Sequence, residues 1–564
     1  MVAPSPGGKP ALGVASRLTN GPGFRTVDRP NPNSAPVAPS EDWESGERTG
    51  LLPLPLPRPT EPPIPLVLAP TPHPDPGPSF GETFRRLVQI LAGFVCVFLV
   101  LRSIGLEPFG VPTGSMAESL VGNHREGGCP RCGATVRVGL RATRPPPFER
   151  SKCPNCGEAV DLSAAPDVPG DRVLVDKTVY AVRSPRRWEV AVFRCPVDDT
   201  KPYVKRVVGL PGELVLLADG DAYANGELLR KNLMQVRETA VPVFDMNFAP
   251  QGGWTARWVV EPVVDPKLPA TRPPAVPKPP DETVLRDSAL FLDASATPDT
   301  AIGLTYRHWQ FDTKADEPVR DWLAYNGPPT ERSNTPVHDF AVSFDLEVLG
   351  GSGSLACRLG DGGDHVTAEF GSGFARLGST EEVPAPPPPK GKKANPPPPP
   401  KPAVLETVGA GVPLEAGKSY RVEFSFVDRR GILAVNGVEV APPLDLSAKP
   451  KGRRAVDRPF QIGARGVSVA VRNLKLFRDI HYRTDGRNTK EPGCQLGPDE
   501  YFMLGDNSAD SQDSREWKTP GVPAADFIGK PFLIHQPMRV GKVTVNGQDR
   551  TFQTVDWSRL RWLR

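Results

Sequence analysis

Four cysteines have the spacing of metal ligands. Cys129 and Cys132 form one Cys-x-x-Cys pair, and Cys153 and Cys156 form a second pair about 20 residues later. Each pair puts two thiolates on one tight turn, and two such turns supply the four sulfur ligands of a tetrahedral zinc site. Four cysteine ligands would close the shell of the ion, so this zinc would be structural. The alternative is a pair of disulfides, which an oxidising compartment favours.

Four other blocks combine hydroxyl, lysine and carboxylate groups with glycines. They are Val111-Pro-Thr-Gly-Ser-Met-Ala-Glu-Ser-Leu120, Gly170-Asp-Arg-Val-Leu-Val-Asp-Lys177, Tyr203-Val-Lys-Arg-Val-Val-Gly-Leu-Pro-Gly-Glu213 and Leu504-Gly-Asp-Asn-Ser-Ala-Asp-Ser-Gln-Asp-Ser-Arg515. Any one of them alone is typical of an ordinary loop, edge strand or turn. Together, in this order and behind an apolar segment, they resemble the sequence boxes of the type I signal peptidases, which are Ser/Lys-dyad peptidases.

The resemblance implies a catalytic role for two residues. Ser115 falls at the position of the nucleophile, and Lys205 falls at the position of the general base. Thr113 takes the place of the hydroxyl that helps the Ser115 amide to stabilise the oxyanion. The Glu118-Ser119 pair stands where the family has Pro-Thr, so the contacts to substrate differ there.

The last block supplies the groups that the resemblance places around the lysine. Ser511 falls where a hydroxyl is hydrogen-bonded to the lysine ammonium, and Asp513 and Arg515 fall where an ion pair holds the region. The remaining predicted members of this supporting set are Gly505, Asp506 and Asn507.

A lysine can act as a base only if its pKa lies well below the free value of about 10.4. Burial among apolar neighbours lowers the pKa of a lysine because it penalises the ammonium form. Val204, Val207 and Val208 would surround Lys205 in this way on a strand. Neutral Lys205 could then take the proton from Ser115, and no cofactor would be needed for catalysis.

The apolar segment predicts a transmembrane helix over residues 84–106. Leu87–Leu101 contains only one polar residue, Gln89, and the whole segment is close to the length that spans a bilayer. Arg85 and Arg86 precede it, and positive flanks tend to stay in the cytoplasm. We therefore expect a single-pass protein of the cell (inner) membrane, with a cytoplasmic N-terminal tail and an extracytoplasmic catalytic domain.

The patterns elsewhere predict a mainly β protein. Residues 1–83 are Pro-rich and are expected to be disordered. Short alternating strands bounded by Gly and Pro follow the helix, as in Tyr203–Gly209. We expect catalytic-core segments at 107–127, 161–238 and 486–564 and a zinc-ribbon insert at 128–160.

Residues 239–485 are expected to be a second insert. Alternating apolar and polar residues at Val342–Val348, Tyr420–Phe426 and Val467–Phe477 suggest an antiparallel β-sandwich similar to laminin-G or concanavalin-like folds. A Pro/Lys tract at Pro384–Pro402 is expected to be a loop. The insert could bind a ligand or act as a spacer.

Composition narrows the function classes. The net charge of +3 over 564 residues gives no reason to expect nucleic-acid binding. The expected partners are precursors with signal peptides and the lipid bilayer, and the expected function is removal of the signal peptide from secreted precursors. A soluble autoprotease of the repressor type shares the dyad but lacks the membrane segment. The main alternative is a catalytically inactive, membrane-anchored binding protein that works through the sandwich.

Overall fold

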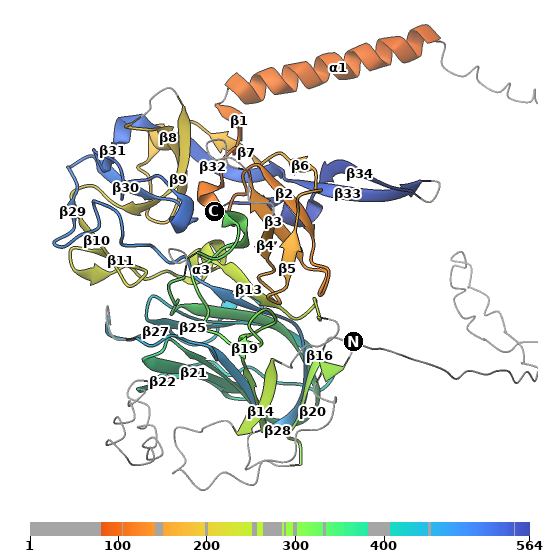
Figure 1. Cartoon of the computed structure of the whole chain (residues 1–564), viewed down its shortest axis with the longest axis vertical. Coiled ribbons are helices and arrows are strands. Elements are labelled where there is room, and N and C mark those ends of the chain that lie inside the picture. The colour runs from red at the N-terminus through yellow and green to blue at the C-terminus, as the bar shows by residue number, and fades with distance from the viewer. Residues whose placement is uncertain are drawn as a thin grey trace, which may run out of the picture. The chain divides into compact units, whose positions relative to one another are not determined.

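The structure is a computed structural model. It describes residues 80–103, 105–140, 150–197, 201–250, 257–262, 285–286, 289–296, 302–330, 334–381, 406–448, 453–545 and 548–563. Strands dominate these residues, which confirms the mainly β fold (Figure 1). Residues 1–79 of the predicted tail and the Pro/Lys tract lie outside the described residues.

The apolar segment forms one long helix, α1 (Phe80–Ser103). Its stretch Phe80–Val100 has a mean hydropathy of 1.8 and is not buried, and it is long and apolar enough to cross a membrane. The helix begins at Phe80 rather than at residue 84, and it ends at Ser103 rather than at 106. Gly105 explains the earlier end, because its positive φ of 86° takes the chain out of the helical conformation.

The central sheet joins segments that are far apart in the sequence. Its strand order is β1-β7-β32-β8-β9-β30-β31, and β35 pairs with β32. The bounds are β1 (Leu106–Gly110), β7 (Arg172–Asp176), β8 (Val190–Arg194), β9 (Pro202–Gly209), β30 (Glu500–Leu504), β31 (Gly521–Pro523), β32 (Phe527–Gln536) and β35 (Arg561–Trp562). Strand β9 therefore lies between its neighbour in sequence, β8, and the much later β30.

Smaller elements surround this sheet. A four-stranded sheet contains β10 (Leu214–Ala218), β11 (Asp221–Ala224), β12 (Glu227–Leu228) and β29 (Cys494–Gln495). The cysteine-rich segment contributes β2 (His124–Gly128), β3 (Thr135–Gly139), β4 (Arg150–Lys152), β5 (Ala159–Asp161) and β6 (Asp167–Val168). The other elements include α2 (Val179–Val182), α3 (Leu233–Thr239) and the hairpin of β33 (Met538–Val545) and β34 (Gln548–Val555).

Residues between β13 and β28 build a separate antiparallel sheet with its own core. Its strands are β13 (Val241–Asp245), β14 (Trp258–Pro262), β15 (Leu285–Arg286), β16 (Ala289–Asp293), β17 (Ile302–Tyr306), β20 (Phe340–Gly360), β21 (Asp364–Gly371), β22 (Phe374–Glu381), β23 (Glu406–Gly409), β24 (Ser419–Val427), β25 (Arg430–Val435), β26 (Val438–Glu439), β27 (Leu444–Asp445) and β28 (Phe460–Arg478). The first part of β20 pairs with β24 and its last part pairs with β21. Alternate side chains such as Val342, Phe344 and Leu346 are fully buried, as their pattern predicts.

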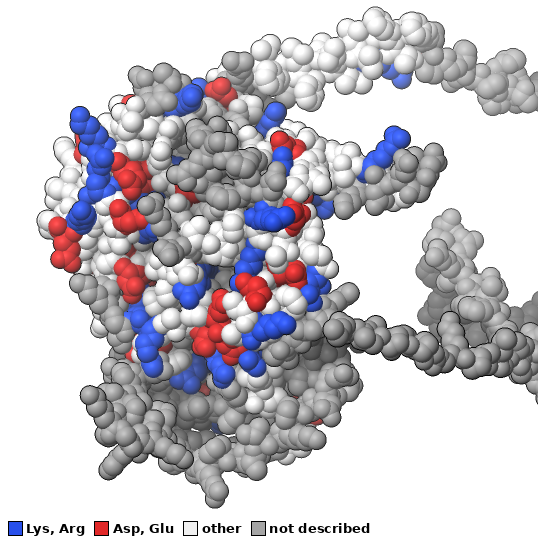
Figure 2. Space-filling view, viewed as in Figure 1, with Lys and Arg blue, Asp and Glu red and all other residues white. Residues whose placement is uncertain are grey.

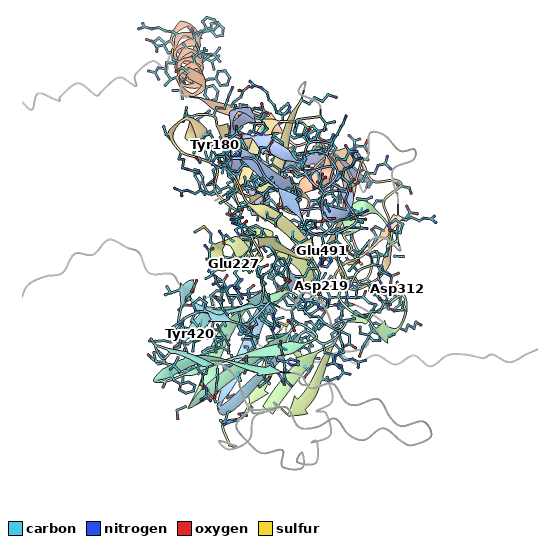
Figure 3. All side chains as sticks on the ribbon, turned by 90° about the vertical axis from the view of Figure 1, so that its left-hand side faces the viewer. Tyr180, Asp219, Glu227, Asp312, Tyr420 and Glu491 are labelled. Atoms are coloured by element: carbon cyan, nitrogen blue, oxygen red, sulfur yellow. The ribbon has the colours of Figure 1, made fainter. Side chains whose placement is uncertain are left out.

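Buried ion pairs fasten this second sheet to the remainder. Lys231 precedes α3, and its Nζ lies 3.0 Å from Asp428 and 2.7 Å from Asp479. Arg453 Nη2 lies 3.0 Å from the buried Asp221 at the start of β11, and Arg453 Nε donates a hydrogen bond over 2.9 Å to the partly exposed Asp219 (labelled in Figure 3) in the turn before it. Because such pairs are costly to break once buried, they hold the two regions in one arrangement.

Candidate active site

Ser115 lies in a single turn of 3₁₀ helix, η1 (Gly114–Met116), directly after β1. Thr113 precedes the turn in an extended conformation, with φ −109° and ψ 154°, and its side chain does not cap the turn. Met116, Ala117 and Leu120 are fully buried, so the segment that follows the serine is anchored in the core. The anchoring holds Ser115, which is itself only 8% exposed, at a fixed place.

Lys205 reaches this serine from the middle of β9. Its Nζ lies 2.5 Å from Ser115 Oγ, although the two residues are 90 positions apart. The lysine side chain is 3% exposed, and Val207 and Val208 beside it are buried. The structure thus brings together the two residues that the resemblance selects.

The pKa of Lys205 is about 8, well below its ordinary value of 10.5. Burial is the main cause, since it penalises the ammonium form. Asp513 opposes the shift of the pKa and Arg515 reinforces it. At pH 7 about a tenth of Lys205 is therefore in the neutral form that a general base requires, far more than for a lysine with the ordinary pKa.

Asp513 and Arg515 form the predicted ion pair beside the lysine. Arg515 Nη2 lies 2.8 Å from Asp513 Oδ2, and both side chains are buried. The same carboxylate accepts a hydrogen bond from the Gly505 amide over 3.0 Å. Burial alone would raise the pKa of Asp513, but Arg515 holds it below its usual range, so the carboxylate remains charged next to Lys205.

A second buried pair connects β9 to the same loop. Arg206 Nε and Nη2 donate to the two carboxylate oxygens of Asp506 over 2.8 and 2.6 Å. Arg206 Nη1 also donates to the Trp188 carbonyl over 2.7 Å. This bidentate contact ties the residue after the lysine to the Gly-Asp-Asn turn.

Ser511 is placed differently from the prediction. Its Oγ is buried but has no hydrogen-bond partner within the described part of the chain, so the expected bond to Lys205 is not formed in this structure. The hydroxyl lies close to the site all the same, because a Cβ on Gly505 would overlap Ser511 Oγ and lie 2.5 Å from the Ser115 carbonyl oxygen. Glycine at 505 is thus required by close packing behind the nucleophile.

Asn507 holds the nucleophile turn from the other block. Its Nδ2 donates to the Gly114 carbonyl over 2.9 Å, and its backbone N–H donates to the Ser115 carbonyl over 3.0 Å. Its side chain also exchanges two hydrogen bonds with Asn326, over 2.8 and 2.7 Å. Asn326 lies between β13 and β28, and its partner lies 181 positions away, so no local motif could have identified it.

The four paired cysteines converge in a buried cluster. Their sulfur atoms all lie within 4.8 Å of one another, and none forms a disulfide. Cys129 and Cys156 are separated by 3.5 Å between sulfurs, and Cys132 and Cys153 by 3.6 Å. A tetrahedral zinc ion with Zn–S bonds of about 2.3 Å needs sulfurs about 3.8 Å apart, so the cluster fits this ion.

The two cysteine turns are built alike. Gly133 donates its N–H to the Cys129 carbonyl, and Gly157 donates its N–H to the Cys153 carbonyl. Both glycines have a positive φ, 76° and 78°, which other residues rarely adopt. The repeated geometry explains why glycine follows each Cys-x-x-Cys pair.

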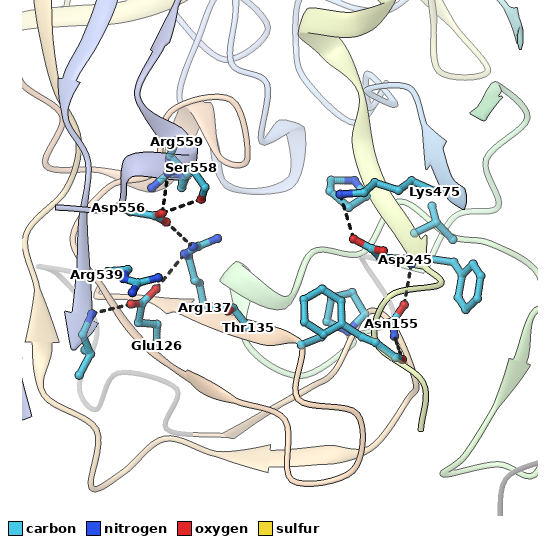
Figure 4. A pocket seen from close by; sticks show the side chains of 17 residues that line it. Glu126, Thr135, Arg137, Asn155, Asp245, Lys475, Arg539, Asp556, Ser558 and Arg559 are labelled. Atoms are coloured by element: carbon cyan, nitrogen blue, oxygen red, sulfur yellow. Dashed lines mark hydrogen bonds and ion pairs between the residues drawn. The ribbon is translucent and has the colours of Figure 1, made fainter. Parts of the chain in front are cut away.

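Two pockets of about 450 Å³ lie near the second sheet, and neither is lined by Ser115 or Lys205. In the first, shown in Figure 4, Arg137 lies 3.1 Å from Glu126 and 3.6 Å from Asp556. Lys475 lies 3.0 Å from Asp245 in the same pocket. These charges are already paired, so the pocket offers less to a charged ligand than its composition suggests.

Charged side chains of both signs are interspersed on the face of the molecule that Figure 2 shows. This face has no large area of one sign among the residues that are described there. The mixture agrees with the small net charge of +3.

A buried serine bonded to a buried lysine, on a β domain that follows an apolar helix, has the arrangement of a serine hydrolase whose base is lysine. The family model described as "Signal peptidase, peptidase S26" matches residues 159–260 and 426–535. This match confirms the resemblance to type I signal peptidases that the sequence blocks indicate. The matched residues include Lys205 and the 504–515 block, whereas Ser115 precedes them.

Individual relatives agree with the family match. A probable signal peptidase I-2 of Synechocystis sp. is 38% identical over 68 residues, which are 11% of this chain and 31% of that protein. Signal peptidase I of Pseudomonas fluorescens is 32% identical over 140 residues, covering 24% and 37%. Signal peptidase I of Rickettsia typhi is 29% identical over 153 residues, covering 27% and 48%. The chain thus spans only 31% to 48% of the length of these relatives.

Among solved structures, an endo-β-1,3(4)-glucanase named SCLam is 10% identical, and the match covers 47% of this chain and 97% of that one. Its TM-score of 0.25 is too low to assign the fold of the insert.

Proposed function

We propose that this protein is a membrane-bound signal peptidase that removes signal peptides from secreted precursors. Ser115 is the nucleophile and Lys205 is the general base. The observation that carries the proposal is the 2.5 Å contact between the two side chains, combined with the lowered pKa of the lysine.

The reaction follows from this geometry. Neutral Lys205 takes the proton from Ser115 Oγ as the oxygen bonds to the scissile carbonyl carbon. The Ser115 N–H and the Thr113 hydroxyl stabilise the oxyanion. Protonated Lys205 then gives its proton to the leaving amine as the C–N bond breaks, and water, activated by the same lysine, hydrolyses the acyl-enzyme.

The edge of β9 supports binding of an extended substrate. Pairing between β9 and β30 begins at Arg206, so within the described strands the edge of β9 at Val204 is open beside Lys205. A peptide that adds to this edge as a strand would bring its carbonyl to Ser115. Small side chains one and three positions before the cut would fit shallow pockets there, as in the family that the chain resembles.

The helix supports a location in the cell (inner) membrane. Arg85 and Arg86 would lie at the cytoplasmic side, and the catalytic domain would lie outside the cytoplasm. Strand β1 starts three residues after α1 ends, and η1 follows β1, so the nucleophile would stay close to the bilayer. Phe552, Trp557 and Trp562 near the C-terminus are at least half exposed, as aromatic residues at a membrane interface often are.

The inserts complete the proposal. Cys129, Cys132, Cys153 and Cys156 would hold one structural zinc ion in a ribbon at 128–160, and no cofactor acts in catalysis. The insert at 239–485 would be a β-sandwich. The catalytic core would consist of the segments 107–127, 161–238 and 486–564.

Cleavage of a model preprotein in detergent tests the proposal. Wild-type protein should cut after a small-x-small site, and Ser115→Ala and Lys205→Met should each lower kcat/KM by at least about 10³-fold. Lys177→Met, which changes an exposed lysine of the same domain, is the matched control and should cleave normally. If the folded wild-type protein cut no preprotein, the inactive binding protein would be the better interpretation.

A further inference from the structure

The second insert reaches the nucleophile turn through one short 3₁₀ helix, η2 (Ala324–Asn326). Tyr325 packs directly against the backbone before the serine, because a Cβ on Gly114 or on Gly139 would overlap its ring. Its hydroxyl donates to the Asn123 carbonyl over 2.9 Å. Tyr325 is 3% exposed and packs in the same hydrophobic core as Ala117 and Val121, so its contact with the nucleophile turn is buried and closely packed.

Asn326 completes the contact through Asn507. Each of these two side-chain amides donates to the oxygen of the other, and Asn507 Nδ2 donates in addition to the Gly114 carbonyl. Asn507 thereby donates both N–H groups of its side-chain amide, one to Asn326 Oδ1 and one to the Gly114 carbonyl. A flipped Asn507 would point its oxygen at the Gly114 oxygen, so the Gly114 carbonyl selects this orientation and the pairing with Asn326 holds the amide group in place.

The Gly114 carbonyl and the Ser115 N–H belong to the same peptide unit. This unit is planar and trans, so fixing the direction of the carbonyl fixes the direction of the N–H. The Ser115 N–H is the oxyanion donor of the proposed reaction. An oxyanion donor stabilises charge only if it is aimed before the reaction begins.

We propose that Asn326 and Tyr325 are positioning residues for the nucleophile turn, and that the insert thereby takes part in transition-state stabilisation. They act through Asn507 and Gly114 and do not touch the reacting atoms. The inference rests on the proposed peptidase function. It gives the insert a role in catalysis beyond that of a spacer or a ligand-binding module.

The support of η2 comes from the cysteine-rich segment. Ser151 Oγ donates to the Ala324 carbonyl over 3.0 Å and lies 3.2 Å from the Gly327 carbonyl. Ala324 also packs in the same core as the four cysteines. The cysteine cluster, η2 and the nucleophile turn therefore form one continuous set of contacts.

Steady-state cleavage of a model preprotein by the full chain in detergent tests this role. Asn326→Ala should lower kcat about 10- to 100-fold with KM changed less than about 2-fold, since an oxyanion donor acts in the transition state. Tyr325→Ala should do the same, whereas Tyr325→Phe, which keeps the ring on Gly114, should stay within about 3-fold of wild type. The acid limb of the pH profile, set by Lys205, should not move.

Asn247→Ala is the matched control, because it removes an exposed amide of the same insert and should leave cleavage unchanged. Unchanged kcat in Asn326→Ala would overturn the proposal. So would a rise in kcat/KM, which would make η2 an obstruction to substrate.

Crystal structures of wild type and Asn326→Ala separate this inference from the proposed function. If the wild type cleaves nothing, the proposed peptidase function is wrong. The positioning role is then tested by comparing the orientation of the Gly114–Ser115 peptide in the two crystal structures. A peptide that is unmoved in the variant would overturn it.

Discussion

Arg206 and Asp506 form a buried bidentate ion pair across 300 positions of sequence. Arg206 follows the lysine on β9, and Asp506 lies in the turn that leads to Asn507. The pair therefore sets the distance between the strand of the general base and the loop that holds the nucleophile turn.

Breaking this pair should destabilise the fold strongly. Asp506→Asn or Arg206→Met should lower the free energy of unfolding by about 3–5 kcal/mol, because the remaining charge would stay buried without its partner. Denaturant unfolding in detergent measures the change. Arg421→Met is the matched control: Arg421 and Asp345 are also 2.8 Å apart but are about 40% exposed, so the loss should be below about 1 kcal/mol. Equal losses at the two sites would contradict the role of burial.

Cleavage should rise with pH through the pKa of Lys205. The base acts in its neutral form, so with a pKa of about 8 the value of kcat/KM should increase about 10-fold between pH 7 and a plateau above pH 9. A pH series with a soluble preprotein peptide measures the profile, and Lys177→Met should leave it unchanged. A flat profile from pH 6 to 10 would show that Lys205 is not the titrating base.

The protein should hold one zinc ion per chain. Elemental analysis of protein purified under reducing conditions measures the metal, and Cys153→Ser should remove it and lower Tm by several degrees. Cys96→Ser, which changes the exposed cysteine of α1, should keep both. Absence of metal together with loss of all four thiols to disulfides would contradict the zinc assignment.

Exposed aromatic residues near the C-terminus should matter only when a bilayer is present. Trp557→Ser and Trp562→Ser together should lower cleavage of a preprotein in vesicles by about 5-fold or more, because the rings would no longer enter the interface. Cleavage of the same preprotein in detergent should be unchanged. Val438→Ser, at a residue equally exposed on the insert, should have no effect in vesicles. A loss in detergent as large as in vesicles would indicate damage to the fold.

The sequence alone determined the features that depend on neighbours along the chain. The apolar run predicted α1, alternation predicted strands such as β9 and β24, and the Cys-x-x-Cys spacing predicted the cluster, because side-chain period and turn geometry are local properties. The blocks around Ser115 and Lys205 could be recognised for the same reason.

Only the tertiary structure decided which distant groups meet. The contact of Lys205 with Ser115, the pair of Arg206 with Asp506 and the amide pair of Asn326 with Asn507 each join segments separated by 90 positions or more. The absence of a hydrogen bond from Ser511 to Lys205 and the packing of Tyr325 on Gly114 could likewise not be predicted from the sequence. A buried polar group is stabilised by whatever partner packing brings to it, and that partner has no fixed spacing in the sequence.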